Sequence, residues 1–245
     1  MDQVILTIKE NVPIAADVRR MVLNGDVAAV TNPGQFINIA LSGRFLRRPI
    51  SVCDRSDDDL TILYKVVGQG TAQMAGMRPG EKLDVLTGLG NGFDLRAAKD
   101  HTLIIGGGIG AAPLYWLGRE LRARGIKTTA VLGVNTEADI FYETEFAAIC
   151  DHVILATADG SRALKGFVTD ALVGLTYDYF YTCGPEPMLK AVWKAAEGDG
   201  EFSFEERMGC GFGACMGCTC RTVTGWKRIC RDGPVLRKEE LLWAD

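Results

Sequence analysis

The pattern of apolar and polar residues changes twice along the chain, and each change marks a different type of structure. The first 97 residues contain short apolar or alternating runs separated by the turn sequences NPG, SDDD, RPG and GNG. Runs at this spacing predict an antiparallel β-barrel or sandwich. We expect strands over VILTI, QFINIAL, RPISVCD, LTILYKVV and KLDVLTGL, and a short helix over TAQMAGM.

From about residue 98, apolar runs alternate with amphipathic segments. The expected strands are TLIIGGG, TTAVLGV, HVILATA and DYFYTCG, and the expected helices are APLYWLGRELRARG, ETEFAAIC, LKGFVTDAL and EPMLKAVWKAAE. Strands that alternate with helices predict a parallel sheet covered on both faces.

The last part of the chain, from about residue 201, is short and rich in glycine and cysteine. It is too small to hold a core alone, so a bound metal would help it fold. The sequence therefore predicts a multidomain chain: a β-barrel over residues 1–97, an α/β domain with a parallel sheet over 98–200, and a small C-terminal domain over 201–245.

Charge and hydropathy exclude some classes of partner. The 245 residues carry a formal net charge of −4, which gives no electrostatic support for binding nucleic acid. No apolar run approaches the roughly 18 residues of a membrane span, and the start MDQVILTIKE shows no signal-peptide pattern. We therefore expect a cytoplasmic protein without a membrane or nucleic-acid partner.

Five of the eight cysteines fall between Cys210 and Cys230. Disulfides are rare in the cytoplasm, so such a cluster indicates metal binding. Four of these cysteines follow the C-x4-C-x2-C-x11-C spacing typical of plant-type [2Fe–2S] clusters: Cys210, Cys215, Cys218 and Cys230. Zinc also binds four cysteines, usually as two CxxC-like pairs, and Cys220 could replace Cys218 as a ligand.

A glycine loop indicates a nucleotide site in the α/β domain. Its glycines end an apolar strand and open a helix, where unpaired N–H groups can bind phosphate: Gly106, Gly107, Gly108 and Gly110. A tight strand-to-helix turn without a ligand would show the same pattern. A later strand ends at Cys183 and Gly184, which we expect beside a nicotinamide, although a free cysteine there is equally a small buried hydrophobe.

The strand TTAVLGV is followed by Asn135, Glu137 and Asp139 rather than by an arginine. An arginine at this place usually binds the 2′-phosphate of NADP, so its absence favours NAD.

Two segments of the predicted barrel are candidates for a flavin site. The first is the RPIS sequence and the second is GT in the turn before a short helix, where a phosphate could bind: Arg48, Pro49, Ile50, Ser51, Gly70 and Thr71. An ordinary barrel edge with an arginine and a tight glycine turn is the alternative.

The order of these motifs along the chain resembles that of the ferredoxin-reductase superfamily. The sequence ERMGCGFGACMGC, followed by Cys230, Asp232, Gly233, Pro234 and Val235, is similar to the electron-transfer subunits of NAD-dependent, two-subunit dihydroorotate dehydrogenases. This resemblance implies that RPIS and GT hold FAD, and that further residues lie beside the flavin: Lys65, Val66 and Val67. It also implies that the four cysteines hold [2Fe–2S] and that NAD(H) is the co-substrate.

The resemblance further implies an oxidoreductase of pyrimidine biosynthesis. The partner would be an FMN-containing catalytic subunit that oxidises dihydroorotate, in a heterotetramer with two copies of each subunit. Electrons would pass from that FMN through [2Fe–2S] and FAD to NAD+, without a catalytic acid or base in this chain. A reductase subunit of a hydrogenase or a sulfide dehydrogenase is the alternative. We expect Phe212 and Met216 to face the partner, unless they cover the cluster within this chain.

Overall fold

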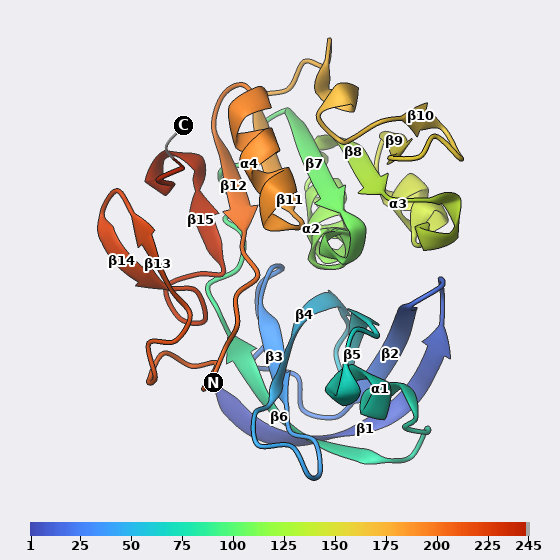
Figure 1. Ribbon diagram of the computed structural model, residues 1–245, viewed down its shortest axis with the longest axis vertical. Coiled ribbons are helices and arrows are strands. Elements are labelled where there is room, and N and C mark those ends of the chain that lie inside the picture. Colours follow the sequence, from blue (N-terminus) through green and yellow to red (C-terminus); the bar gives the residue numbers. More distant parts are fainter. Residues whose placement is uncertain (244–245) are drawn as a thin grey trace.

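The computed structural model describes residues 1–243. Figure 1 shows two large parts, a barrel and a sheet flanked by helices, with the C-terminal segment lying beside both. Among the described residues, no helix is long and apolar enough to cross a membrane.

The N-terminal part is a closed antiparallel barrel. Its order is β1-β2-β5-β4-β3-β6, with β1 Asp2–Pro13, β2 Val18–Asn24, β3 Phe36–Ile39, β4 Arg48–Arg55, β5 Asp59–Lys65 and β6 Lys82–Leu89. In β6 every second side chain is buried, which is the alternation of a strand with one face toward a core. A short helix, α1 (Gln69–Ala75), follows β5.

The central part is a seven-stranded sheet in the order β10-β9-β8-β7-β11-β12-β15. The strands are β7 His101–Gly107, β8 Lys127–Val134, β9 His152–Thr157, β10 Leu164–Lys165, β11 Tyr179–Cys183, β12 Gly200–Ser203 and β15 Val235–Arg237. All neighbouring strands are parallel except β12 and β15. The edge strand β15 comes from the C-terminal segment, so this segment is joined to the sheet by main-chain hydrogen bonds.

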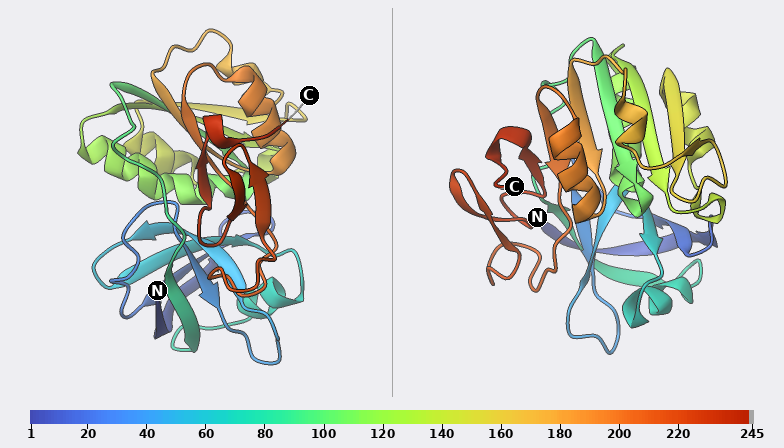
Figure 2. Two further views of the ribbon diagram at one scale, coloured as in Figure 1. Left: turned by 90° about the vertical axis from the view of Figure 1, so that its left-hand side faces the viewer. Right: turned by 45° about the horizontal axis from the view of Figure 1, so that its top comes forward.

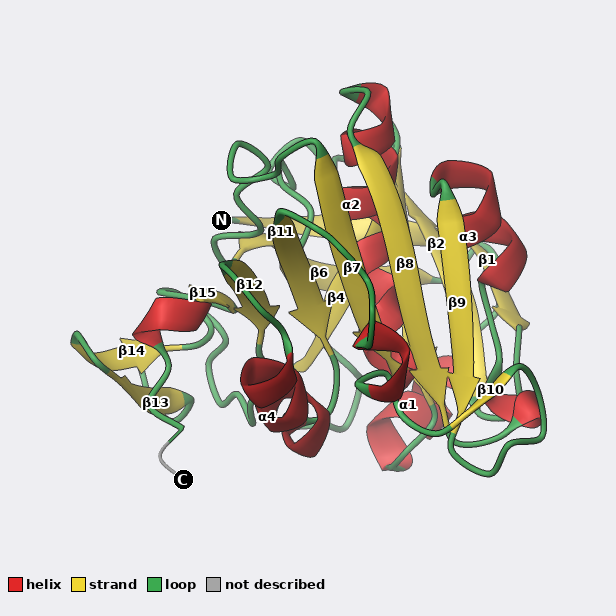
Figure 3. Cartoon of the chain, turned by 90° about the horizontal axis from the view of Figure 1, so that it is seen from above, coloured by secondary structure: helices red, strands yellow, loops and turns green. Residues whose placement is uncertain are grey.

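Helices cover both faces of the sheet, as Figure 3 shows. One face packs against α2 (Ala112–Ala123) and α3 (Glu143–Ile149), and the other packs against α4 (Glu186–Ala195). In α2 the buried residues Leu114, Leu117 and Leu121 recur at helical spacing. A strand buried on both faces must be apolar throughout, and β7 is buried from Thr102 to Gly107.

The cysteine-rich segment lies along the side of the molecule, next to the sheet and the barrel (Figure 2). Its hairpin consists of β13 (Thr219–Thr222) and β14 (Gly225–Arg228). Cys218 and Cys230 belong to the same apolar group as Leu189 of α4 and Phe202 of β12. The segment therefore shares its core with the sheet, which explains how so short a piece folds.

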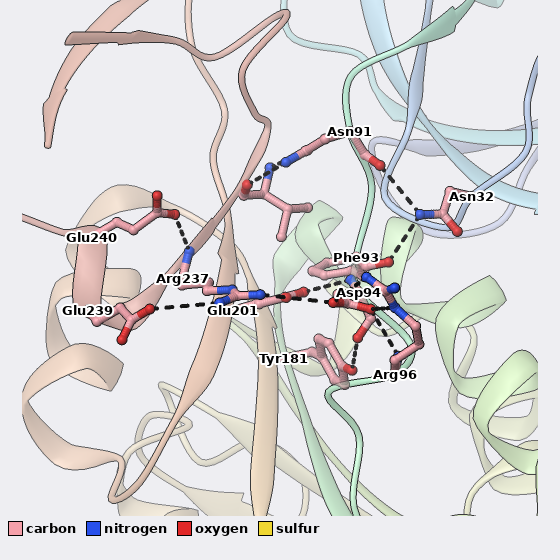
Figure 4. Close-up of polar contacts among 11 residues, drawn as sticks. Asn32, Asn91, Phe93, Asp94, Arg96, Tyr181, Glu201, Arg237, Glu239 and Glu240 are labelled. Carbon is pink, nitrogen blue, oxygen red and sulfur yellow. Dashed lines mark hydrogen bonds and ion pairs between the residues drawn. The ribbon is translucent and has the colours of Figure 1, made fainter. Parts of the chain in front are cut away.

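The connection between barrel and sheet, residues 90–96, is held by three parts of the molecule (Figure 4). Asn32 of the barrel donates to the carbonyl of Phe93, at 3.1 Å. Asn91 donates to the carbonyl of Val235 on the C-terminal segment, at 2.8 Å. Glu201 of β12 accepts the N–H of Asp94, at 3.0 Å. Hydrogen bonds at this joint therefore help to fix the relative placement of the barrel, the sheet and the cysteine-rich segment.

The structure differs from the sequence-based expectation in several elements. The segment 164–172 is not a helix: it forms the short strand β10 and a single 3-10 turn at Asp170–Leu172. Gly166 has a φ of +135°, which a right-handed helix does not allow, and Asp170 accepts the N–H of Phe167 at 2.7 Å to close a turn. The sequence analysis predicts neither β2 nor the C-terminal strands β12, β13, β14 and β15.

Candidate functional site

The four cysteines at the predicted spacing form two pairs. The N–H of Cys210 lies 3.4 Å from the sulfur of Cys215, and the N–H of Cys215 lies 3.4 Å from the sulfur of Cys210. The N–H of Cys230 donates to the sulfur of Cys218, also at 3.4 Å. No three His, Cys, Asp or Glu side chains form a single-ion group among residues 1–243. A [2Fe–2S] cluster has four thiolates for two irons, and two thiol pairs suit that arrangement.

Backbone N–H groups of the loop surround the first pair. Burial raises the pKa of the Cys210 thiol, but hydrogen bonds from the N–H groups of Cys215 and Phe212 outweigh burial and lower the pKa to about 6. The N–H of Ala214 also points to this sulfur, at 3.3 Å. Because iron binds thiolate rather than thiol, these donors favour the ligating form and would also stabilise charge on a cluster.

The second pair is buried. Cys218 and Cys230 are 2% and 1% exposed. Burial and the neighbouring Cys218 thiol raise the pKa of Cys230 to about 12, so iron would have to displace a proton here. The two pairs thus differ in environment, one at the surface within the loop and one against the apolar core.

Cys220 lies outside this arrangement. It stands on β13 and lines a separate cavity of about 170 Å³ with Pro185, Phe204 and Trp243. Burial raises the pKa of its thiol. This placement supports the choice of Cys218 over Cys220, and the choice remains a prediction.

The two flavin candidates meet at one end of the barrel. The guanidinium of Arg48, at the start of β4, lies against Gly70 at the start of α1, where an added Cβ would lie 2.9 Å from the arginine Cζ. Arg48 also donates to the carbonyl of Leu46, at 2.6 Å. The Arg48 guanidinium beside the Gly70 backbone forms a positively charged site, here called the phosphate cradle, that suits a phosphate group.

The Thr71 hydroxyl is already engaged in the turn before α1. It accepts the N–H groups of Val67 and Gly68, at 3.0 and 3.2 Å, and donates to the carbonyl of Gly68. Its first role is therefore to shape this turn. The neighbouring Val67 side chain is 77% exposed, so an apolar surface is available beside Arg48 and Gly70 for an aromatic ring system.

Three of the four loop glycines are needed for packing. A Cβ on Gly110 would lie 2.5 Å from the carbonyl oxygen of Cys183, and one on Gly106 would lie 3.0 Å from Cα of Ala111. A Cβ on Gly107 would meet the side chains of Met188 and Pro185. These glycines allow the close approach of β7, α2 and β11.

Gly108 is different, because it has a φ of +52° and open space around its Cα. Of the four loop glycines, only Gly108 has no neighbour where a side chain would lie, so a phosphate could approach the backbone there. Cys183 pairs with Gly106 at the carboxyl ends of β11 and β7, the edge at which parallel sheets bind nucleotides. Burial raises the pKa of Cys183 to about 12, so this cysteine is a neutral small side chain at the site.

Sequence reasoning missed Arg162 near the end of β8. It lies 3.7 Å from Glu137 and 2.9 Å from Glu143. An arginine here could bind a 2′-phosphate, but two carboxylates already share its charge. The pairing could not be found by spacing, because Arg162 follows β9 while its partners follow β8.

Two family models match the chain. The iron–sulfur cluster binding domain of dihydroorotate dehydrogenase B matches residues 205–242, and the oxidoreductase NAD-binding domain matches residues 104–194. The electron transfer subunit of dihydroorotate dehydrogenase B (NAD(+)) from Fusobacterium nucleatum is 44% identical, over 94% of each chain. The chain belongs to this family of electron transfer subunits. The subunit from Geobacillus sp. is 42% identical, over 99% of each chain.

Solved structures show the same fold. An NADH-dependent reduced ferredoxin-NADP oxidoreductase, described for flavin-based electron bifurcation, matches with a TM-score of 0.89 and 30% identity, covering 97% of this chain and 90% of that one. Phthalate dioxygenase reductase, at 20% identity, shows the same fold over 79% of this chain and 64% of its own, with a TM-score of 0.64. The predicted family, fold class and oxidoreductase character are confirmed.

Proposed function

We propose that this member of the dihydroorotate dehydrogenase B family carries electrons from an FMN-containing, dihydroorotate-oxidising partner to NAD+, with a [2Fe–2S] cluster on the C-terminal loop and FAD on the barrel. When bound, the flavin would exchange hydride with nicotinamide and single electrons with the cluster. The observation that carries the proposal is the two thiol pairs, presented by a loop beside the barrel (Figure 2).

The residues of the chain have distinct tasks in this proposal. Arg48 and Gly70 would bind the FAD diphosphate, while Pro49, Ile50, Ser51 and the segment 65–67 would line the ring system. The glycine loop and the edge at Cys183 and Gly184 would place the nicotinamide. No side chain has to move a proton, because hydride and electron transfer need position and potential rather than a general base.

The partner would dock on the cluster loop. Phe212 and Met216 are 41% and 53% exposed, although large apolar side chains are usually buried. A one-electron centre must lie close to the centre with which it exchanges electrons, so the exposed apolar tip marks the docking face. We propose a heterotetramer of two copies of each subunit. All eight cysteines are free, which suits the reducing cytoplasm.

Reconstitution tests this function. The purified chain should show flavin and iron–sulfur absorbance. Mixed with the FMN subunit, it should reduce NAD+ when dihydroorotate is added. A chain that binds only zinc, or one that reduces NAD+ only with hydrogen or sulfide as the donor, would contradict the proposal.

The same assay gives the nucleotide preference. We expect faster reduction of NAD+ than of NADP+, because Arg162 is ion-paired with Glu137 and Glu143 and is therefore not available to bind a 2′-phosphate. Equal use of both nucleotides would show that Arg162 leaves these carboxylates for a 2′-phosphate.

A further inference from the structure

Asn38 lies where the barrel meets the cluster loop. It stands on β3 and is 1% exposed. Its Nδ2 donates to the carbonyl of Cys210, 172 residues away in sequence, at 3.2 Å. On the same strand pair, Asn38 lies opposite Pro49 of β4. One side chain thus connects the strand next to the proposed flavin site with the first cysteine of the cluster loop.

The orientation of the Asn38 amide is fixed by this contact. Its Oδ1 is buried and has no hydrogen-bond partner. Buried polar atoms without a partner are rare in folded proteins, so each one needs an explanation. Turning the amide over would place Oδ1 against the carbonyl of Cys210, with two acceptors facing each other. The unpartnered oxygen is therefore the consequence of using Nδ2 to hold the loop.

The loop is shaped to receive this side chain. Gly211 has a φ of +79°, and an added Cβ would overlap the Asn38 amide. In a trans peptide the C=O and the N–H point in opposite directions. Holding the Cys210 carbonyl toward the barrel therefore turns the Gly211 N–H away from it, while the N–H groups of Ala214 and Cys215 point to the Cys210 sulfur.

We propose that Asn38 is a positioning residue that fixes the first cluster-binding turn against the strand pair β3–β4, and so sets the separation and orientation of the cluster relative to the flavin. This inference rests on the proposed function for the redox role of both sites. The contact has no chemical role of its own. It keeps the acceptor of one electron, the cluster, close to its donor, the flavin, when NADH is the reductant.

Two variants test the contact from its two sides. Asn38→Asp keeps the shape but removes the donor, so a carboxylate faces the Cys210 carbonyl. Gly211→Ala leaves the barrel sequence unchanged and places a methyl group where the Asn38 amide lies. The matched controls are Asn24→Ala, which removes a barrel asparagine bonded to the carbonyl of Asp58 at 3.1 Å, and Gly174→Ala, at a φ of +80° with open space.

Three readouts are compared. Hydrogen exchange at residues 211–215 should be about two- to tenfold faster in both test variants, the factor expected for one lost hydrogen bond. Bleaching of the cluster by NADH should slow, while NADH-to-ferricyanide activity through the flavin stays at the parent rate. The electron paramagnetic resonance signal of the reduced cluster should broaden. Both controls should behave like the parent chain.

The outcomes separate the two proposals. Parent-like exchange, cluster bleaching and resonance signal in Asn38→Asp and Gly211→Ala would overturn the role of Asn38. A parent chain that purifies without flavin or iron–sulfur absorbance would instead overturn the proposed function. If Asn38→Asp does not fold, Gly211→Ala alone tests the role of Asn38, because its substitution lies in the loop and not in the barrel core.

Discussion

Cys218 and Cys220 are separated by one residue but lie in different environments. The sulfur of Cys218 accepts the N–H of Cys230, whereas Cys220 lines the cavity beside α4. We predict that serine at Cys210, Cys215, Cys218 or Cys230 abolishes the cluster, because serine is a poor iron ligand compared with thiolate. Cys220→Ser should keep it. Iron content and the visible spectrum are the measurements, and a cluster that survives Cys218→Ser but not Cys220→Ser would reverse the assignment.

Arg48 is the residue that we expect to contribute most to flavin binding. Its guanidinium already lies at Gly70, in the proposed phosphate cradle. Arg48→Ala removes a charge-assisted hydrogen bond, worth about 1.5–3 kcal/mol, so FAD affinity should fall by roughly one to two orders of magnitude. Titration of the apo-flavoprotein with FAD measures this. The control is Arg96→Ala, which removes an exposed arginine, and equal affinity of Arg48→Ala and the parent would count against the cradle.

At the residue scale, sequence patterns predicted the positions of important residues better than they predicted the structural roles of those residues. The glycine loop was correctly placed at the end of β7. Its motif suggested phosphate binding, but Gly106, Gly107 and Gly110 have neighbours where a side chain would be. Only the folded structure reveals such neighbours, because Cys183 and Met188 come from elements far away in the sequence.

At the scale of elements, strands with a strong period were predicted well. Burial alternates strictly along β6, and β7 is buried from Thr102 to Gly107; the sequence predicts both strands. The strand β2 contains Arg19 and Arg20, which obscure its alternation. These side chains reach Asn11 and Glu10 of β1, a cross-strand pairing that a local pattern does not reveal. The false helix at 164–172 arose because its apolar spacing outweighed Gly166.

The edge strand β15 was missed for a different reason. It is only three residues long, Val235–Arg237, and it pairs antiparallel with β12. A strand this short has no period to detect. Its position is determined by tertiary contacts, including the two hydrogen bonds between Asn91 and Val235.

The strand β12 carries a buried acid that makes stability depend on pH. Glu201 is 3% exposed, and burial raises its pKa from the ordinary value of 4.5 to about 7. Between these values the folded state binds a proton that the unfolded state does not. The contribution of Glu201 to stability should therefore fall as the pH rises from about 4.5 to about 7, and stay constant above.

Glu201→Gln tests this linkage. The amide keeps an acceptor for the Asp94 N–H but does not titrate. The change in the free energy of unfolding with pH should therefore be about 2–3 kcal/mol smaller in the variant than in the parent. Urea unfolding at pH 5.5 and 8 gives the difference between variant and parent. Glu239→Gln, at an exposed carboxylate, is the control. Parallel stability curves for the parent and Glu201→Gln would show that Glu201 titrates alike in both states.

At the scale of the whole molecule, three parts meet at one joint. The connection 90–96 is bound by the barrel, the sheet and the C-terminal segment (Figure 4). The order of the three parts along the chain could be predicted, because each has its own pattern. Their relative placement could not, since it depends on pairs such as Asn91 with Val235 that lie 144 residues apart.

This fixed arrangement leaves the cluster loop at the surface. We predict that Phe212→Asp and Met216→Asp weaken assembly with the FMN subunit by at least about tenfold, because a charge would be buried in an apolar contact. The dissociation constant, from calorimetry or analytical ultracentrifugation, is the measurement. Cluster content and NADH-to-dye activity should stay unchanged, since neither side chain is an iron ligand in the proposed set.

Val173→Asp provides the control for this experiment, because Val173 is an 84% exposed apolar residue outside the cluster loop. It should not affect assembly. If Phe212 and Met216 instead cover the cluster within this chain, their variants should assemble normally but lose the cluster faster in air. Normal assembly together with electron transfer at the parent rate would place the docking face elsewhere on the molecule. The loss of assembly with an intact cluster is therefore the outcome that assigns the loop to the partner.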